Sequence, residues 1–131
     1  MRVYKTKVFA RFARQEGIAD KALWRAAAQI RAGNLDADLG SGVYKQRIAR
    51  SGSGKSGGFR TILFFSRGSH LCFAYGYPKS RKANITAGEL AAFRKLAGVM
   101  LGYGERQIAM AFEAGELTEV LADDDADQGT T

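Results

Sequence analysis

The chain has 131 residues, of which 46% are hydrophobic, so it can form one folded domain with an apolar core and is too apolar for a disordered chain. Its 20 Lys and Arg outnumber its 13 Asp and Glu, which gives a formal net charge of +7 and favours an anionic partner such as a nucleic acid. The single cysteine, Cys72, excludes an internal disulfide and a cysteine zinc site, and we expect it to be a buried thiol.

The charges are divided between a basic body and an acidic end. Residues 1–104 contain 19 Lys and Arg against 5 Asp and Glu, whereas residues 105–131 contain one Arg against 8 Asp and Glu. We expect residues 122–131 to be a disordered acidic tail that either competes for the basic face or only aids solubility. The start, MRVYKTKVF, has no apolar signal region, and no stretch approaches about 18 apolar residues, so we expect a cytoplasmic protein without membrane association.

The N-terminal part predicts one strand and two helices. Alternation predicts a strand over residues 2–6, and apolar spacing predicts a helix over residues 7–15 that Gly17 ends. Asp20 is expected to be the N-cap of a second helix, which Gly33 stops. The residues on the inner faces of these helices, which we expect in the core, are Phe9, Phe12, Leu23 and Trp24.

Residues 34–41 are predicted to form a loop. Asp36 and Asp38 within it have a spacing that could hold a hard cation. Two carboxylates without a third ligand nearby are more often a solvated turn, so we assign no metal site here.

Residues 43–77 are expected to form a three-stranded antiparallel meander, with strands over residues 43–49, 59–65 and 71–77. Between Leu39 and Gly88 the chain carries basic residues and no Asp or Glu. These bases are Lys45, Arg47, Arg50, Lys55, Arg60, Arg67, Lys79, Arg81 and Lys82. A surface with cations and no carboxylates is suited to a polyanion that repeats its phosphates along a chain.

Alternation places three of these cations in specific positions. Lys45 and Arg47 share one face of the first strand, and Arg60 begins the central strand, both of whose faces are largely apolar. An arginine at the start of a buried strand needs an anionic partner or a satisfied hydrogen-bond network. A ligand phosphate is one candidate, and an ion pair with Glu16 or Glu89 is the alternative.

The connection over residues 50–58 is rich in glycine and carries Lys55. Gly54-Lys55-Ser56 fits the end of a Walker A motif, but Ala49 stands where the first glycine is required, and the flanking elements are both strands. We therefore expect a mobile hairpin loop that carries Lys55.

The third strand leads Tyr75 and Tyr77 into a basic turn over residues 78–82. Aromatic rings among cations are typical of single-stranded RNA recognition, because rings stack on bases while cations hold the backbone. The residues that we predict to bind the substrate are Lys55, Tyr75, Tyr77, Arg81 and Lys82.

The C-terminal part predicts helices. Thr86 and Glu89 form a capping box that opens a helix, which Gly102 and Gly104 end. Its apolar face is expected to contain Leu90, Phe93, Ala97 and Met100. A further helix is expected over residues 105–114, and residues 117–121 fit either a strand or a helical turn.

Together these segments resemble the RelE/ParE toxin superfamily and, within it, the HigB-like branch. The resemblance is carried by VYKQRI, GKSGGFRTI, AYGYPK and KANI, which begin at residues 43, 54, 74 and 82, and by the order of elements up to about residue 104. It implies a RelE-like α+β fold, in which two N-terminal helices pack on an antiparallel sheet and one or two helices follow at the C-terminus. It also implies a single toxin domain over residues 1–121.

The resemblance implies a toxin of a type II toxin–antitoxin system. Such a toxin is an endoribonuclease that cleaves mRNA, usually on the ribosome, needs no cofactor and is neutralised by a cognate helix-turn-helix antitoxin. Two alternatives are a toxin of the same fold that inhibits DNA gyrase and a basic nucleic-acid-binding protein without toxicity.

Cleavage of RNA without a metal uses the 2′-hydroxyl as nucleophile, and it needs a base, an acid and cations around the phosphorus. The only histidine is His70, in an expected surface turn, so no histidine pair exists. Clustered carboxylates for metal catalysis are also missing from the basic stretch.

Cations are therefore the candidate catalytic residues. Arg60 is expected to stabilise the charge that develops on the phosphorane. Lys45 and Arg47 are expected to bind the scissile phosphate, with Lys45, crowded by other cations, as a candidate general base. The candidates for the general acid are Lys79, Tyr75 and Tyr77.

Overall fold

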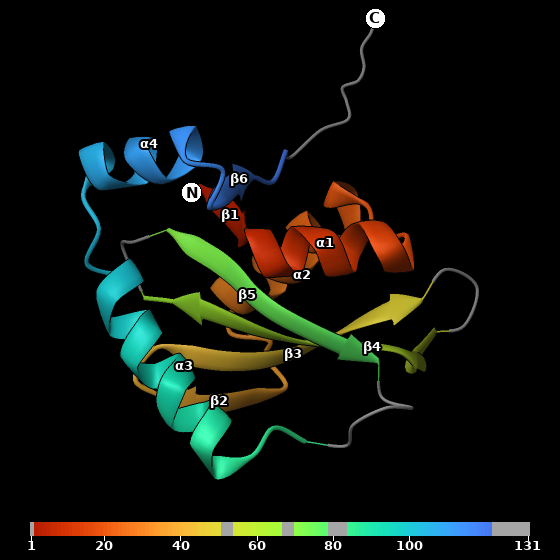
Figure 1. Ribbon diagram of the computed structural model, residues 1–131. Coiled ribbons are helices and arrows are strands. Elements are labelled where there is room, and N and C mark those ends of the chain that lie inside the picture. The colour runs from red at the N-terminus through yellow and green to blue at the C-terminus, as the bar shows by residue number, and fades with distance from the viewer. Residues whose placement is uncertain (1, 51–53, 67–69, 79–83, 122–131) are drawn as a thin grey trace, which may run out of the picture.

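A mixed β-sheet forms the centre of the molecule, and helices pack against both of its faces (Figure 1). The computed structural model describes residues 2–50, 54–66, 70–78 and 84–121, and of residues 50 and 54–57 it describes the backbone only. In chain order the described elements are β1 (Val3–Thr6), α1 (Lys7–Glu16), α2 (Asp20–Arg31), β2 (Ala37–Gly40), β3 (Val43–Arg50), β4 (Gly54–Phe65), β5 (Leu71–Pro78), α3 (Ala87–Met100), α4 (Glu105–Glu113) and β6 (Leu117–Glu119).

The strands lie side by side in the order β2-β3-β4-β5-β1-β6. Neighbouring strands are antiparallel except β1 and β5, which are parallel. The predicted α+β fold, with two helices before the meander and two after it, is confirmed. The undecided segment at residues 117–121 supplies the strand β6.

The hairpins differ from the prediction. Residues 34–41, predicted as a loop, contain the strand β2, which turns into β3 at Ser41 and Gly42 with φ values of 57° and 82°. Two successive positive φ values match the twist of a tight hairpin, which explains why β2 forms there. The next connection is also shorter than predicted, because β3 continues to Arg50 and β4 begins at Gly54, so the backbone of Lys55 lies in a strand.

The N-cap prediction for α2 is wrong. The N-cap residue is Ala19, and Asp20 lies in the first turn of the helix. The Asp20 carboxylate instead accepts hydrogen bonds from Lys5 Nζ at 2.8 Å and from the backbone N–H of Leu121 at 3.1 Å. It therefore joins β1, α2 and the segment after β6, while its charge still complements the helix N-terminus.

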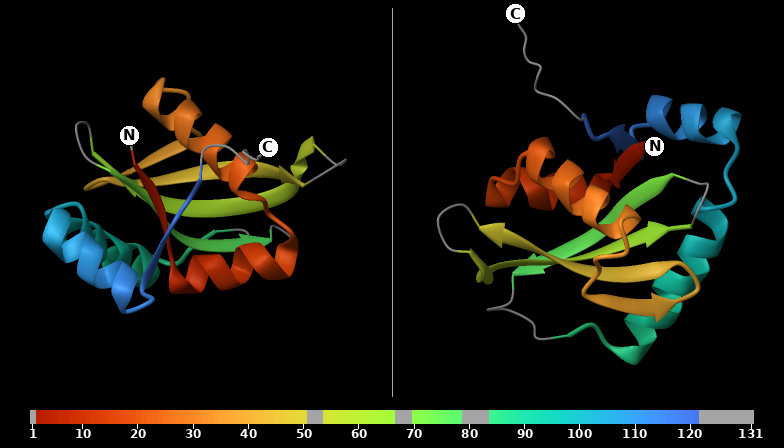
Figure 2. Two further views of the ribbon diagram at one scale, coloured as in Figure 1. Left: turned by 90° about the horizontal axis from the view of Figure 1, so that it is seen from above. Right: turned by 180° about the vertical axis from the view of Figure 1, so that it is seen from behind.

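The core has two parts, one on each side of the sheet. Leu63 on β4 packs with α1 and α2, whereas Ile62 and Phe64 on the same strand pack with α3 and α4. This alternation confirms the predicted central, buried strand. The view from above in Figure 2 shows α2 on one side of the sheet and α3 with α4 on the other. Cys72 is fully buried, as predicted, and burial raises the pKa of its thiol to about 12.

The helix ends follow the sequence signals. Thr6 accepts a hydrogen bond from the N–H of Phe9 at the start of α1, and Gly17 ends α1 with a φ of 71°. Thr86 and Glu89 form the predicted capping box of α3. Within the described part of the chain, every helix is too short or too polar to cross a membrane.

Two glycines provide a matched test of the packing. A Cβ atom on Gly76 would lie 2.4 Å from the ring of Phe12, which is itself packed against Phe9 and Phe59. A Cβ atom on Gly98, in α3, would meet no atom within 4 Å. We expect Gly76→Ala to lower the free energy of unfolding by about 2 kcal/mol and Gly98→Ala to raise it by about 0.5–1 kcal/mol. Thermal unfolding of both variants tests this, and equal melting temperatures would contradict the close contact at Gly76.

Candidate functional site

The register of β3, β4 and β5 brings the predicted cations and aromatic residues together in two rows. Arg47 pairs with Arg60, which pairs with Tyr77, and in the next row Lys45 pairs with Ile62, which pairs with Tyr75. Residues that pair across adjacent strands point to the same face of a sheet. Lys45, Arg47, Arg60, Tyr75 and Tyr77 therefore leave the sheet on the side of α3, although they come from three strands.

Arg60 lies directly opposite Arg47 and is half-buried. It makes an ion pair with neither Glu16 nor Glu89, and in the part of the chain that the structure describes no carboxylate lies within ion-pair distance of it. Like charges directly opposite each other destabilise a sheet. The arrangement is thus unfavourable for the fold and favourable for holding an anion.

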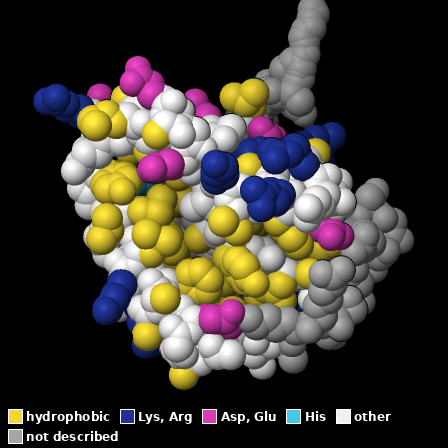
Figure 3. Space-filling model, in the orientation of Figure 1, with side chains coloured by type: hydrophobic (Ala, Val, Ile, Leu, Met, Phe, Trp, Pro, Cys, Tyr) yellow, Lys and Arg dark blue, Asp and Glu magenta, His cyan; other side chains and the backbone are white. Residues whose placement is uncertain are grey.

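Aromatic rings stand beside this pair. The ring of Tyr75 lies 5.9 Å from that of Tyr77 and 5.6 Å from that of Phe93 on α3, measured between centroids. Tyr77 is only 3% exposed, whereas Tyr75 is half-buried, so Tyr75 offers the ring surface to a ligand. Figure 3 shows hydrophobic side chains gathered over β5 and α3 on this face.

A hollow of about 260 Å³ separates the end of α1 from β5 next to these tyrosines. Phe12, Gln15 and Glu16 line it from α1, and Tyr75 and Tyr77 line it from β5. Beside the hydrophobic surface, Figure 3 also shows a cluster of Lys and Arg side chains along α1.

This cluster on α1 was missed by the sequence analysis. Lys7, Arg11 and Arg14 are exposed and recur at the i, i+4, i+7 spacing of one helix face. The signal for it in the sequence is this spacing, on the helix face opposite the apolar one. The basic surface is therefore larger than the meander.

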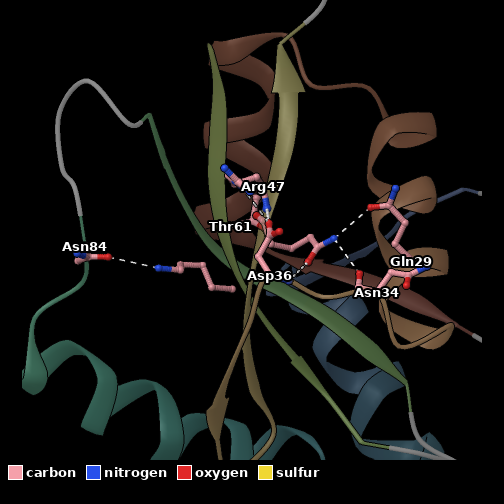
Figure 4. Close-up of polar contacts among 8 residues, drawn as sticks. Gln29, Asn34, Asp36, Arg47, Thr61 and Asn84 are labelled. Carbon is pink, nitrogen blue, oxygen red and sulfur yellow. Dashed lines mark hydrogen bonds and ion pairs between the residues drawn. The ribbon is translucent and has the colours of Figure 1, made fainter. Parts of the chain in front are cut away.

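Lys45 and Arg47 are held in different ways. Lys45 Nζ donates to Asn84 Oδ1 at 3.3 Å, just before α3 (Figure 4). The backbone N–H of Arg47 donates to Asp36 Oδ2 at 2.6 Å, and the Arg47 Nε lies 3.5 Å from the same oxygen. Asp36 therefore fixes Arg47 at the edge of the sheet, while the side chain of Arg47 stays 43% exposed.

A buried amide supports this contact. Gln46 is 1% exposed and donates through Nε2 to Gln29 Oε1 at 3.1 Å and to the carbonyl oxygen of Asn34 at 3.3 Å. Its Oε1 accepts from the N–H of Asp36 at 2.9 Å, and its backbone carbonyl accepts from Thr61 Oγ1 at 2.8 Å (Figure 4). Gln46 thus fixes the segment that carries Asp36.

The carboxylates of Asp36 and Asp38 both accept hydrogen bonds from the protein backbone. Asp36 binds Arg47, and Asp38 accepts a hydrogen bond from the backbone N–H of Gly40 at 2.9 Å. Among the described residues there is no group of three or more His, Cys, Asp and Glu side chains that could hold a metal ion.

The remaining candidates cannot be placed. Lys79, Arg81 and Lys82 lie outside the described residues, and for Lys55 only the backbone is described, in β4.

The prediction that His70 is a surface residue is wrong. His70 is half-buried, its Nε2 lies 3.0 Å from the carbonyl oxygen of Met100, and its ring meets the edge of Tyr4 at 5.3 Å. His70 lies just before β5 and against the end of α3, which explains the burial. We therefore assign His70 a structural role.

The buried network can be tested by removal of its central amide. We expect Gln46→Leu to lower the free energy of unfolding by about 2–3 kcal/mol, because it leaves the N–H of Asp36, the carbonyl of Asn34 and the amide of Gln29 without their partner. The control is Gln15→Leu, an exposed position at which we expect a change within about 0.5 kcal/mol. Chemical denaturation measures both, and equal values would contradict the network.

The described site combines the cations Lys45, Arg47 and Arg60 with the partly exposed ring of Tyr75. A family model described as the RelE toxin of the RelE/RelB toxin–antitoxin system matches residues 1–120. No curated protein matches the chain. Because the match covers nearly the whole chain and agrees with the fold, the protein belongs to the RelE toxin family of RelE/RelB toxin–antitoxin systems.

Proposed function

We propose that the protein is a metal-independent endoribonuclease that cleaves mRNA on the ribosome. The observation that carries this proposal is the placement of Arg47 directly opposite Arg60, beside Lys45 and Tyr75, without a described carboxylate to neutralise Arg60. Repulsion between the two arginines destabilises the folded protein. The same two cations stabilise a phosphorane that gains negative charge.

The reaction assigns each group a task. The 2′-oxygen attacks the adjacent phosphorus, the bond to the 5′-oxygen breaks, and the products are a 2′,3′-cyclic phosphate and a 5′-hydroxyl. Lys45 is the proposed base for the 2′-hydroxyl proton, Arg60 and Arg47 hold the phosphorane oxygens, and Lys79 or Tyr75 protonates the 5′-oxygen. Positioning by the ribosome compensates for the weakness of these groups as acids and bases.

The proposal includes a partner. Membership of the family implies a RelB-type antitoxin, and we propose that the cognate antitoxin carries a helix-turn-helix domain, as in the HigB-like branch. A basic face of this size is complementary to an acidic antitoxin segment.

Removal of the central arginine tests the assignment. We expect Arg60→Ala to lower the cleavage rate by about 100-fold or more, because one preorganised cation is lost from the transition state. Arg106→Ala, an exposed position on α4, is the control and should cleave within about threefold of wild type. Primer extension on an mRNA translated with purified components measures both, with a parallel reaction that lacks ribosomes.

The outcomes separate the alternatives. An Arg60→Ala variant that folds normally and cleaves like wild type would remove Arg60 from the site. Cleavage without ribosomes would indicate a free ribonuclease. A wild-type protein that stops growth but cuts no RNA would refute the nuclease and favour inhibition of gyrase.

The ends of the cut RNA test the metal-independent chemistry. We expect the downstream fragment to carry a 5′-hydroxyl, because the 5′-oxygen leaves when the 2′-oxygen attacks. Polynucleotide kinase should then label this fragment without prior phosphatase treatment. A fragment that needs phosphatase carries a 5′-phosphate, which would indicate attack by water and contradict the proposed role of the 2′-hydroxyl.

A further inference from the structure

A second hollow lies on the α2 side of β3, opposite the face from which Arg60 leaves the sheet. It has a volume of about 160 Å³ and lies between α2 and β3. Arg25 and Gln29 supply polar side chains from α2, Ala22, Ala26 and Ile48 supply apolar surface, and Arg47 borders the hollow on β3. None of these α2 residues was singled out from the sequence for a binding role.

The polar groups of this hollow are available to a ligand. Arg25 is exposed and makes no ion pair with any residue of the described ranges. Arg47 is held by Asp36 through its Nε but keeps 43% of its side chain exposed. Arg25 is therefore the cation that α2 presents to the hollow, and Arg47 borders the hollow from β3.

Gln29 adds a fixed hydrogen-bond donor. Its Oε1 accepts from the buried Gln46, which sets the orientation of the amide. Figure 4 shows the Gln29 nitrogen on the side away from this network, and within the described part of the chain that nitrogen has no hydrogen-bond partner. A preorganised amide beside an apolar floor is suited to the edge of a nucleobase.

Arg47 connects this hollow with the row of cations. It lines the hollow and is also the direct strand partner of Arg60. Beyond Lys45 the outer edge of β3 has no strand beside it in the described chain, because β2 begins at Ala37, the partner of Lys45. Beyond the contact between Asp36 and Arg47, an RNA chain bound at Arg60 can thus cross this edge and reach α2.

We propose that the hollow between α2 and β3 binds one nucleotide next to the cleaved bond and selects its base, an inference that rests on the proposed nuclease function. The base lies on the alanine surface of α2 and meets the Gln29 amide, while Arg25 holds its phosphate. Because small side chains keep the hollow open, the sequence context of cleavage depends on Ala22 as well as on Arg25.

Two pairs of variants test the proposal. Ala22→Leu fills the hollow and Arg25→Gln removes the cation that α2 presents to it; Ala28→Leu and Arg31→Gln make the same changes at exposed positions of α2 that do not line it. Cleavage sites would be mapped by sequencing of cDNA ends on an mRNA that contains every codon, translated with purified components. We expect Ala22→Leu and Arg25→Gln to reduce the preference for the favoured sites about tenfold, as for a lost phosphate or base contact. The two controls should keep the wild-type preference.

Identical preferences in all five proteins, or equal changes in both pairs, would overturn the proposal. If the wild-type protein cuts no RNA, the nuclease proposal fails independently of the hollow. Binding at the hollow is then measured by nuclear magnetic resonance of the ¹⁵N-labelled protein with an RNA hexamer. A shift of the Gln29 side-chain amide that Ala22→Leu abolishes would still support a nucleotide site. No shift at saturating RNA, or a shift with an acidic peptide in place of RNA, would refute it.

Discussion

The register between β3 and β4 is the constraint on which the site and the core both depend. Side chains alternate along a strand, so a slip of one residue would exchange the two faces of β4. Leu63 would then face α3 and α4, and Ile62 and Phe64 would face α1 and α2. These residues fill the two halves of the core, and their burial stabilises the observed register. The same register sets Arg60 opposite Arg47. The apolar contacts thus stabilise a pair of like charges that would not stay together by itself.

The polar groups around β3 give this edge a fixed shape. The buried side chain of Gln46 joins α2 to the segment before β2, and its backbone carbonyl accepts a hydrogen bond from Thr61 on β4. A buried amide whose oxygen and nitrogen both have partners specifies one arrangement, because every alternative leaves a buried group without a partner. Asp36, which Gln46 holds, in turn binds the backbone N–H of Arg47. Gln29 lines the hollow between α2 and β3. A chemistry that relies on positioning rather than on strong acids and bases benefits from such rigidity.

The helices α1 and α3 each use one face for the core and contribute other side chains to the surface that we propose for RNA. α1 buries Phe9 in the core and exposes Lys7, Arg11 and Arg14 on its other face. α3 packs through Ala97 and Met100 and adds the ring of Phe93 beside Tyr75. The surface that we propose for RNA is consequently assembled from elements at both ends of the chain, around three consecutive strands. It combines cations with the rings of Tyr75 and Phe93. Proteins that bind single-stranded nucleic acids use cations for the backbone and aromatic rings for the bases.

The sequence by itself determined the α+β class, most of the helices and strands, the buried central strand, the capping box at Thr86 and the one-sided charge of the meander. These features depend on periodicity and on local hydrogen bonds, which neighbouring residues specify. Only the tertiary structure decided that β2 pairs with β3, that β1 lies parallel to β5, that Asp20 binds Lys5 rather than capping its helix, and that His70 is packed against Tyr4. It also decided the position of Gln46 and the hollow that Arg25 shares with Arg47. Each of these contacts joins residues that are distant in the chain, and their energies depend on burial and register, which exist only after the elements have packed.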